Sequence, residues 1–69
     1  MKRETVVSSN IRSIGYDQNT NILEVEFRSG RVYQYMHVPI EKYQGIMAAE
    51  SHGKYLNRLI KNNYPYREV

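Results

Sequence analysis

The sequence contains no cysteine, no tryptophan, only two prolines and a single phenylalanine among its 69 residues. Without cysteine the chain can form no disulfide, no thiolate zinc site and no cysteine nucleophile. No apolar run approaches the length of a membrane-spanning helix or of the core of a signal peptide. The sequence therefore predicts a cytoplasmic protein without a membrane partner.

A chain of this length can build one modest hydrophobic core, because a domain of this size buries only roughly 60% of the surface that its unfolded chain exposes. Hydrophobic residues make up 41% and charged residues 25% of the chain, which is typical of a folded domain. We expect a single domain over residues 1–69, with a frayed amino terminus over 1–9 and a carboxyl-terminal tail over 62–69. So small a core favours self-association.

The first two expected strands differ in how regular their apolar pattern is. Over residues 23–28, apolar and charged side chains alternate, the pattern of a strand with one buried and one solvated face. Over residues 11–16, the apolar residues Ile11, Ile14 and Tyr16 break strict alternation, and a β-bulge near residues 12–13 restores the phase. A turn is expected between these strands, over residues 17–21.

The connection to the third strand has two alternative registers. If residues 28–30 form a three-residue loop with Gly30 in the left-handed conformation, Tyr33 and Tyr35 lie on the apolar face. If the loop has two residues, the register shifts by one and both tyrosines lie on the solvated face. The first register is favoured because the second buries Gln34 against Val25.

Two short helices are expected after the third strand. Apolar residues recur at helical spacing over residues 39–49, with Pro39 as the first helical residue. Ser51 is expected as the N-cap of a second helix, which ends at Asn62. The prediction is an α+β fold: a three-stranded antiparallel β-meander followed by two short α-helices packed on one face of the sheet.

Five segments carry a family resemblance, namely Gly15-Tyr16-Asp17, Leu23-x-Val25-x-Phe27-x-x-Gly30, Tyr33-Gln34-Tyr35, Val38-Pro39 and Ala49-x-Ser51-x-Gly53-x-Tyr55-x-Asn57. This ordered set lies in a region from about Ser9 to Tyr64 that resembles the KTSC domain. That family is named for a segment at the carboxyl end of some lysyl-tRNA synthetases, and it also occurs as a free-standing bacterial or phage protein. The resemblance implies a small α+β module without enzymatic activity, and its attachment to a tRNA enzyme suggests RNA as the partner.

The residues themselves indicate no catalytic or metal site. His37 and His52 stand at no recognisable spacing from an acid and a serine, and no third ligand accompanies them. Glu24 and Glu26 share a strand face, which we interpret as an ordinary solvated face rather than an acid–base pair. We therefore expect a protein that is not an enzyme and needs no cofactor.

The start of the second helix is the strongest candidate for anion binding. Ser51-His52-Gly53-Lys54 combines a capping hydroxyl, a small residue and a cation at a helix end that favours negative charge. Lys54 opposes the helix dipole by about 0.3–1 kcal/mol, so a negative partner would explain it. In the alternative interpretation, Ser51 merely caps the helix, Gly53 lets the first helix approach, and Lys54 lies in solvent.

A basic surface is expected around this helix start. The net charge of +3 favours a polyanion as partner. Lys54, Arg58 and Lys61 are spaced to align along one side of the second helix, and Arg28 and Arg31 flank the hairpin tip. Seven tyrosines could add base stacking, and the hairpin register decides whether Tyr33 and Tyr35 are core or stacking residues. The residues predicted to bind nucleic acid or phosphate are Ser51, His52, Gly53, Lys54, Arg58, Arg31, Tyr33 and Tyr35.

The first functional prediction is a non-enzymatic module that binds RNA or another phosphate-bearing ligand. A second hypothesis is a homo-oligomer that sequesters a small or cyclic nucleotide between subunits, as a phage-encoded anti-defence protein would. A third is a protein-interaction adaptor that uses residues 64–66 or an open sheet edge. Residues 64–66, Tyr-Pro-Tyr, follow the second helix and must either fold back on the sheet or dock on another subunit.

Overall fold

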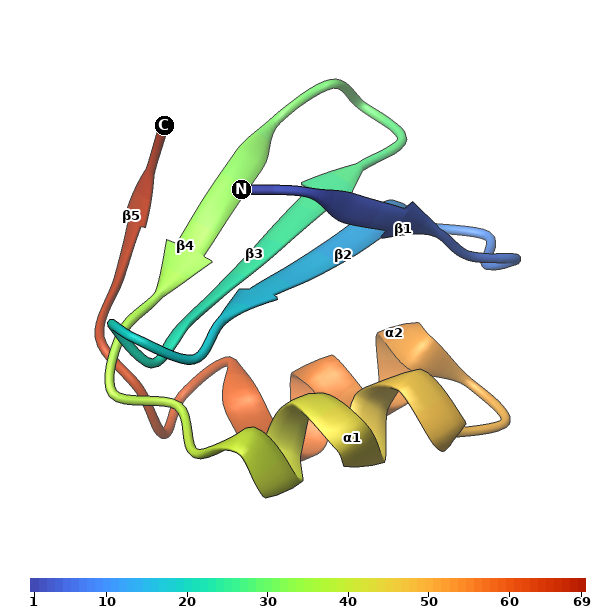
Figure 1. The fold of residues 1–69 in the computed structure, drawn as a ribbon. Helices are drawn as coiled ribbons and strands as arrows, with labels where there is room; N and C mark the ends of the chain where they lie inside the picture. Colours follow the sequence, from blue (N-terminus) through green and yellow to red (C-terminus); the bar gives the residue numbers. More distant parts are fainter.

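The computed structural model describes residues 1–69 as a five-stranded antiparallel sheet with helices on one of its faces (Figure 1). The strands lie in sequence order across the sheet. They are β1 (Arg3–Thr5), β2 (Ile11–Asp17), β3 (Ile22–Phe27), β4 (Val32–Tyr35) and β5 (Tyr66–Glu68). The helical elements are α1 (Ile40–Ala48), α2 (His52–Tyr55) and the π-helical segment η1 (Leu56–Ile60), which continues α2. The predicted α+β class is confirmed, but the sheet has five strands rather than three.

The β3–β4 hairpin has the predicted register. Gly30 has a φ of 97°, a left-handed conformation that glycine adopts without strain, and it closes the loop over residues 28–30. Tyr33 lies opposite Val25, which places Tyr33 and Tyr35 on the same face as the buried apolar side chains. The predicted bulge in β2 is also present, because the pairing of β2 with β3 shifts between residues 11 and 13.

Both ends of the chain form edge strands, which corrects the prediction of a frayed amino terminus and bears out the first of the two alternatives for the tail, that it folds back on the sheet. Arg3 pairs with Gly15, so β1 extends the sheet beside β2. Tyr66 pairs with Tyr35 and its ring stacks on Tyr33 at 5.5 Å, so the tail folds back on the sheet as β5. Three-residue strands with no buried side chain show no alternating pattern, and periodicity therefore missed them. The strand order places β1 and β5 at opposite edges of the sheet.

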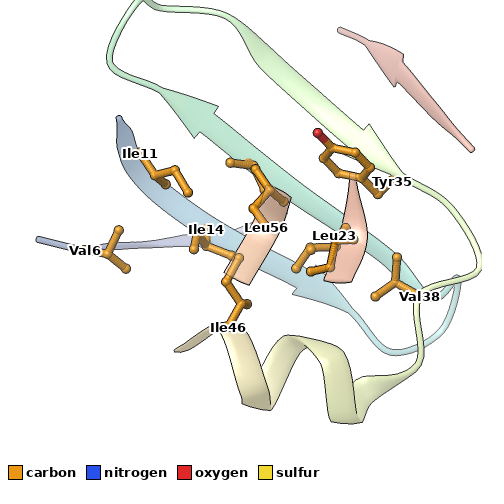
Figure 2. Packing of buried hydrophobic residues seen from close by; sticks show 10 residues of the cluster. Val6, Ile11, Ile14, Leu23, Tyr35, Val38, Ile46 and Leu56 are labelled. Atoms are coloured by element: carbon orange, nitrogen blue, oxygen red, sulfur yellow. The ribbon is translucent and has the colours of Figure 1, made fainter. Parts of the chain in front are cut away.

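The hydrophobic core lies between the sheet and the helices (Figure 2). Its ten buried residues are Val6, Ile11, Ile14, Leu23, Val25, Tyr35, Val38, Ile46, Leu56 and Ile60. Half-buried tyrosines, among them Tyr16, Tyr43 and Tyr55, pack against this cluster. The rings of Tyr16 and Tyr43 stack with centroids 5.1 Å apart, and the Tyr16 hydroxyl donates to the Val38 carbonyl.

The second helix begins as predicted, and the first begins one residue later than predicted. Ser51 caps α2, because its hydroxyl accepts a hydrogen bond of 3.2 Å from the Lys54 N–H. Pro39 is extended at ψ 154° and is therefore the N-cap of α1 rather than its first helical residue. Neither helix has the length and apolarity needed to cross a bilayer.

Gly45 rather than Gly53 is the glycine that lets the two helices approach each other. A Cβ atom on Gly45 would overlap the Tyr55 hydroxyl and lie 2.6 Å from the Tyr55 Cζ atom. A Cβ atom on Gly53 would meet only the Asn10 side chain, at 3.6 Å, which is an ordinary van der Waals distance. The alternative interpretation of Gly53 as a helix-contact residue is therefore wrong.

The sheet face opposite the helices carries a row of polar contacts, here called the polar row (Arg3, Glu24, Gln34 and Arg67). Arg3 Nη1 lies 2.6 Å from Glu24 Oε2, and Gln34 Nε2 donates to Glu24 Oε1 at 2.8 Å. Arg67 donates twice to Gln34 Oε1, at 3.0 and 3.1 Å. These contacts connect both edge strands through the centre of the sheet.

Glu24 is buried, with 8% of its surface exposed, so the prediction of a solvated glutamate at this position is wrong. The reason lies in Gly15, which stands between Arg3 on β1 and Glu24 on β3. Because Gly15 has no side chain, the Arg3 guanidinium can cross β2 and cover the Glu24 carboxylate. Glu26 remains half-buried and accepts a hydrogen bond from Ser13.

Candidate ligand-binding site

A pocket of about 380 Å³ lies where the tip of the β3–β4 hairpin, the loop after β1 and the second helix meet. We call it the hairpin pocket. The hairpin supplies an aromatic and a basic wall, and the helix supplies Leu56, Asn57 and Lys61. The loop supplies Ser9 and Asn10. Residues from three separate parts of the chain therefore converge on one hollow.

The hairpin pocket is lined by three cations, Arg28, Arg31 and Lys61, and by no carboxylate. The ion pairs of the protein involve Arg3 and lie on the other face of the sheet, so none neutralises these three cations. Arg28 Nε donates to the Ser8 carbonyl at 2.7 Å, which orients this guanidinium and leaves its two terminal nitrogens free to bind. The pocket therefore favours a negatively charged ligand.

Aromatic rings form one wall of the pocket. The ring of Tyr33 meets Phe27 edge-on at 5.6 Å and stacks on Tyr66 at 5.5 Å. Tyr35 is 2% exposed and belongs to the core, in agreement with the favoured hairpin register, which places it on the apolar face. Tyr33 is only half-buried and lies at the rim, where an aromatic ligand can contact it.

Burial raises the pKa of Tyr35 to about 12, with smaller contributions from Tyr33 and Tyr66. Because this pKa lies above the ordinary tyrosine pKa of 10.0, the stabilisation from protonated Tyr35 is fully present below pH 10 and is lost as the pH rises through 12. A shift of this size corresponds to a loss of at most about 3 kcal/mol in the free energy of unfolding. Urea denaturation of wild type and Tyr35→Phe between pH 9 and pH 12 measures it. The free energy of unfolding of Tyr35→Phe should fall distinctly less than that of the wild type as the pH rises. Parallel plots of stability against pH would contradict the raised pKa of Tyr35.

Four of the predicted binding residues, Ser51, His52, Gly53 and Lys54, line a second and adjoining hollow of about 320 Å³. We call it the helix-start hollow. Two of the four have structural roles, because Ser51 caps α2 and His52 Nδ1 lies 2.7 Å from the Ile46 carbonyl. A carbonyl only accepts, so the imidazole donates this bond and joins α2 to the end of α1.

The predicted basic stripe on the second helix is divided. Lys61 lines the hairpin pocket, whereas Arg58 lines a separate hollow that it shares with Lys54. The prediction assumed α-helical spacing, but the Lys61 N–H bonds the Leu56 carbonyl five residues earlier, at 2.8 Å, as in a π-helix. This wider turn changes the direction of Lys61 relative to the residues before it.

Of the predicted site residues, Arg31, Tyr33 and Tyr35 therefore come together, with Lys61 in place of Arg58. Sequence reasoning missed Ser9, Asn10 and Asn57, which line both hollows. Asn10 stands in no recognisable motif, whereas Asn57 belongs to the last segment of the family resemblance, which gave it no binding role.

The protein is thus a small α+β domain that has a basic pocket beside a short β-hairpin. The KTSC domain model matches residues 7–64, and the chain belongs to this family. A crystal structure of a KTSC domain protein from Yersinia pestis is similar with a TM-score of 0.96 and 40% identity, covering 99% of this chain and 96% of that one. The sequence-based resemblance is thus confirmed.

Two relatives show the settings in which such a domain occurs. A protein from Stutzerimonas stutzeri is 46% identical over 70 residues, which cover 100% of this chain and 99% of its own length. A lysine–tRNA ligase from Nostoc punctiforme is 34% identical over 59 residues, which cover 86% of this chain but 10% of the ligase. The domain therefore resembles both a protein of similar length and a small part of a large enzyme.

Proposed function

We propose that this protein is a non-enzymatic module that binds single-stranded RNA, or another phosphate-bearing ligand, in the hairpin pocket. The proposal rests on one observation: the same pocket contains three cations and a half-buried tyrosine. No carboxylate lines this pocket. The cations Arg28, Arg31 and Lys61 would contact phosphates, and the exposed part of Tyr33 would contact a base. The similar segment in a protein named lysine–tRNA ligase supports RNA as the ligand.

The expected binding energy is part electrostatic and part stacking. Each phosphate neutralised on a single strand contributes a slope of about −0.7 to the dependence of log affinity on log salt concentration. A base stacked on an aromatic side chain contributes about 1–3 kcal/mol. Three phosphate contacts would therefore give a slope of about −2, which distinguishes this mode from apolar binding.

Arg31→Glu should weaken binding of a labelled single-stranded RNA at least about tenfold, since it replaces an attraction by a repulsion inside the pocket. The measurement is fluorescence anisotropy at two salt concentrations. Arg12→Glu is the matched control, because Arg12 is exposed on β2, lines no pocket and undergoes the same change of charge. Equal losses in both variants would show that only net charge matters and would contradict a site at the hairpin pocket.

The volume of the pocket also fits the second hypothesis, a sequestered small nucleotide, because ligand pockets start at about 300 Å³. In that case a mononucleotide or cyclic nucleotide would bind more tightly than RNA, and light scattering would show an oligomer. Binding of neither ligand would favour a protein-interaction adaptor and would contradict the proposed function.

A further inference from the structure

The hairpin pocket and the helix-start hollow share a wall made by Ser9, Asn10 and Asn57, of which the two asparagines carry side-chain amides. The main chain of Asn10 is held on both sides, because its N–H donates to the Ser8 hydroxyl at 3.3 Å and its carbonyl accepts from the Arg28 N–H at 2.8 Å. Asn57 lies on the second helix directly after the buried Leu56. Both residues therefore stand on well-supported backbone.

The side-chain amides of Asn10 and Asn57 make no hydrogen bond within the protein, and both residues are exposed. Gly53 lies beside the first of them, since a Cβ atom on Gly53 would be at an ordinary contact distance of 3.6 Å from Asn10 Nδ2. Two amides thus offer donors and acceptors at the junction of the two hollows. Their backbone positions are set before any ligand binds, so little ordering is required on binding.

The two hollows differ in charge. The hairpin pocket has three cations and no acid, whereas the helix-start hollow has Lys54 together with Glu50. Glu50 opposes a phosphate in the second hollow, and the polar lining there suits a neutral group that forms hydrogen bonds. A nucleotide base has these properties, since its edges present donors and acceptors without charge.

We propose that the two hollows form one groove for successive nucleotides of a single strand, in which Asn10 and Asn57 select the base. This inference rests on the proposed function and adds the specificity-determining residues to it. An asparagine amide pairs most commonly with adenine, through a donor and an acceptor that adenine presents side by side. The expected ligand is therefore a single strand that places an adenine at the junction.

The test compares oligoadenylate, oligouridylate and oligocytidylate of ten nucleotides with the wild type, Asn10→Ala and Asn57→Ala. The wild type should bind oligoadenylate about tenfold more tightly than the other two oligomers. Each variant should lose most of this preference while keeping the slope of affinity against salt. Asn62→Ala is the matched control, because Asn62 is also exposed but lies outside both hollows.

The outcomes separate this inference from the proposed function. Equal binding of the three oligomers, or a preference that survives in Asn10→Ala and Asn57→Ala, would overturn base selection. The proposed function would still stand in that case if Arg31→Glu weakens binding. A preference for another base that these variants abolish would overturn the assignment to adenine. Absence of salt-dependent binding by the wild type would overturn the proposed function itself. Circular dichroism melts of each variant confirm that the fold is unchanged.

Discussion

Gly15→Ala should lower the free energy of unfolding by about 3 kcal/mol, although it adds a single methyl group. The new Cβ atom would lie 2.6 Å from the Lys2 carbonyl oxygen and 2.9 Å from Arg3 Cγ. The first of these contacts is with backbone, so β1 must move away from β2. Arg3 then leaves the Glu24 carboxylate, which stays buried without its cation, and such a charge is costly.

Urea denaturation of Gly15→Ala, Arg3→Ala and the double variant tests this route. Because alanine at position 15 already displaces the Arg3 side chain, the double variant should be little less stable than Gly15→Ala alone. Fully additive losses would show that the two positions act independently and would refute the explanation. Arg12→Ala, an exposed arginine on the neighbouring strand, should change stability by no more than about 0.5 kcal/mol.

The same substitution should have opposite effects at the two glycines of the helices. Gly45→Ala should destabilise the protein by about 2 kcal/mol, because the Cβ atom would collide with the Tyr55 ring and overpacking of this kind costs about 1–3 kcal/mol. Gly53→Ala meets only ordinary contacts and should stabilise the protein by about 0.5 kcal/mol, since alanine is the better helix former.

Thermal and urea denaturation of both variants measure the difference. Gly45→Ala made in a Tyr55→Ala background supplies the control, because it should be neutral or stabilising once the ring is absent. A loss of similar size with and without Tyr55 would place the strain elsewhere, and equal effects at Gly45 and Gly53 would contradict the packing described above.

The central strands were predictable because their signals are local. Alternation over residues 23–28 predicts which side chains of β3 are buried. Of the two hairpin registers, only the one with a three-residue loop ending at Gly30 keeps Gln34 out of the core. The break in alternation at residues 11–16 likewise required a bulge, and the structure has one between residues 11 and 13. Each of these features depends on residues that are neighbours in sequence.

The edge strands and the polar row depend instead on residues far apart in the chain. Nothing in residues 3–5 or 66–68 predicts a strand, because none of these side chains is buried. Arg3 reaches Glu24 only because Gly15 lies between them in the sheet, and Tyr66 is held by rings on β4. Pairing of this kind is decided by tertiary contacts rather than by local pattern.

The candidate site was predicted only in part, because some of its residues are placed by local pattern and others by tertiary structure. The hairpin register brought Tyr33 and Tyr35 to the correct face, and Arg31 follows from the position of the loop. Lys61 and Arg58 were placed on one side of a helix that was assumed to be regular, but the π-helical turn separates them.

Strand β5 also influences the order in which the molecule can fold. The pairs β2–β3 and β3–β4 join strands that follow each other directly, whereas β4 and β5 are separated by residues 36–65, which contain both helices. Closing so long a loop costs more entropy than forming a hairpin, so β5 is expected to dock last and to exchange its amide hydrogens first. Since Tyr66 of β5 supports the ring of Tyr33, the aromatic wall of the hairpin pocket is complete only after this final step.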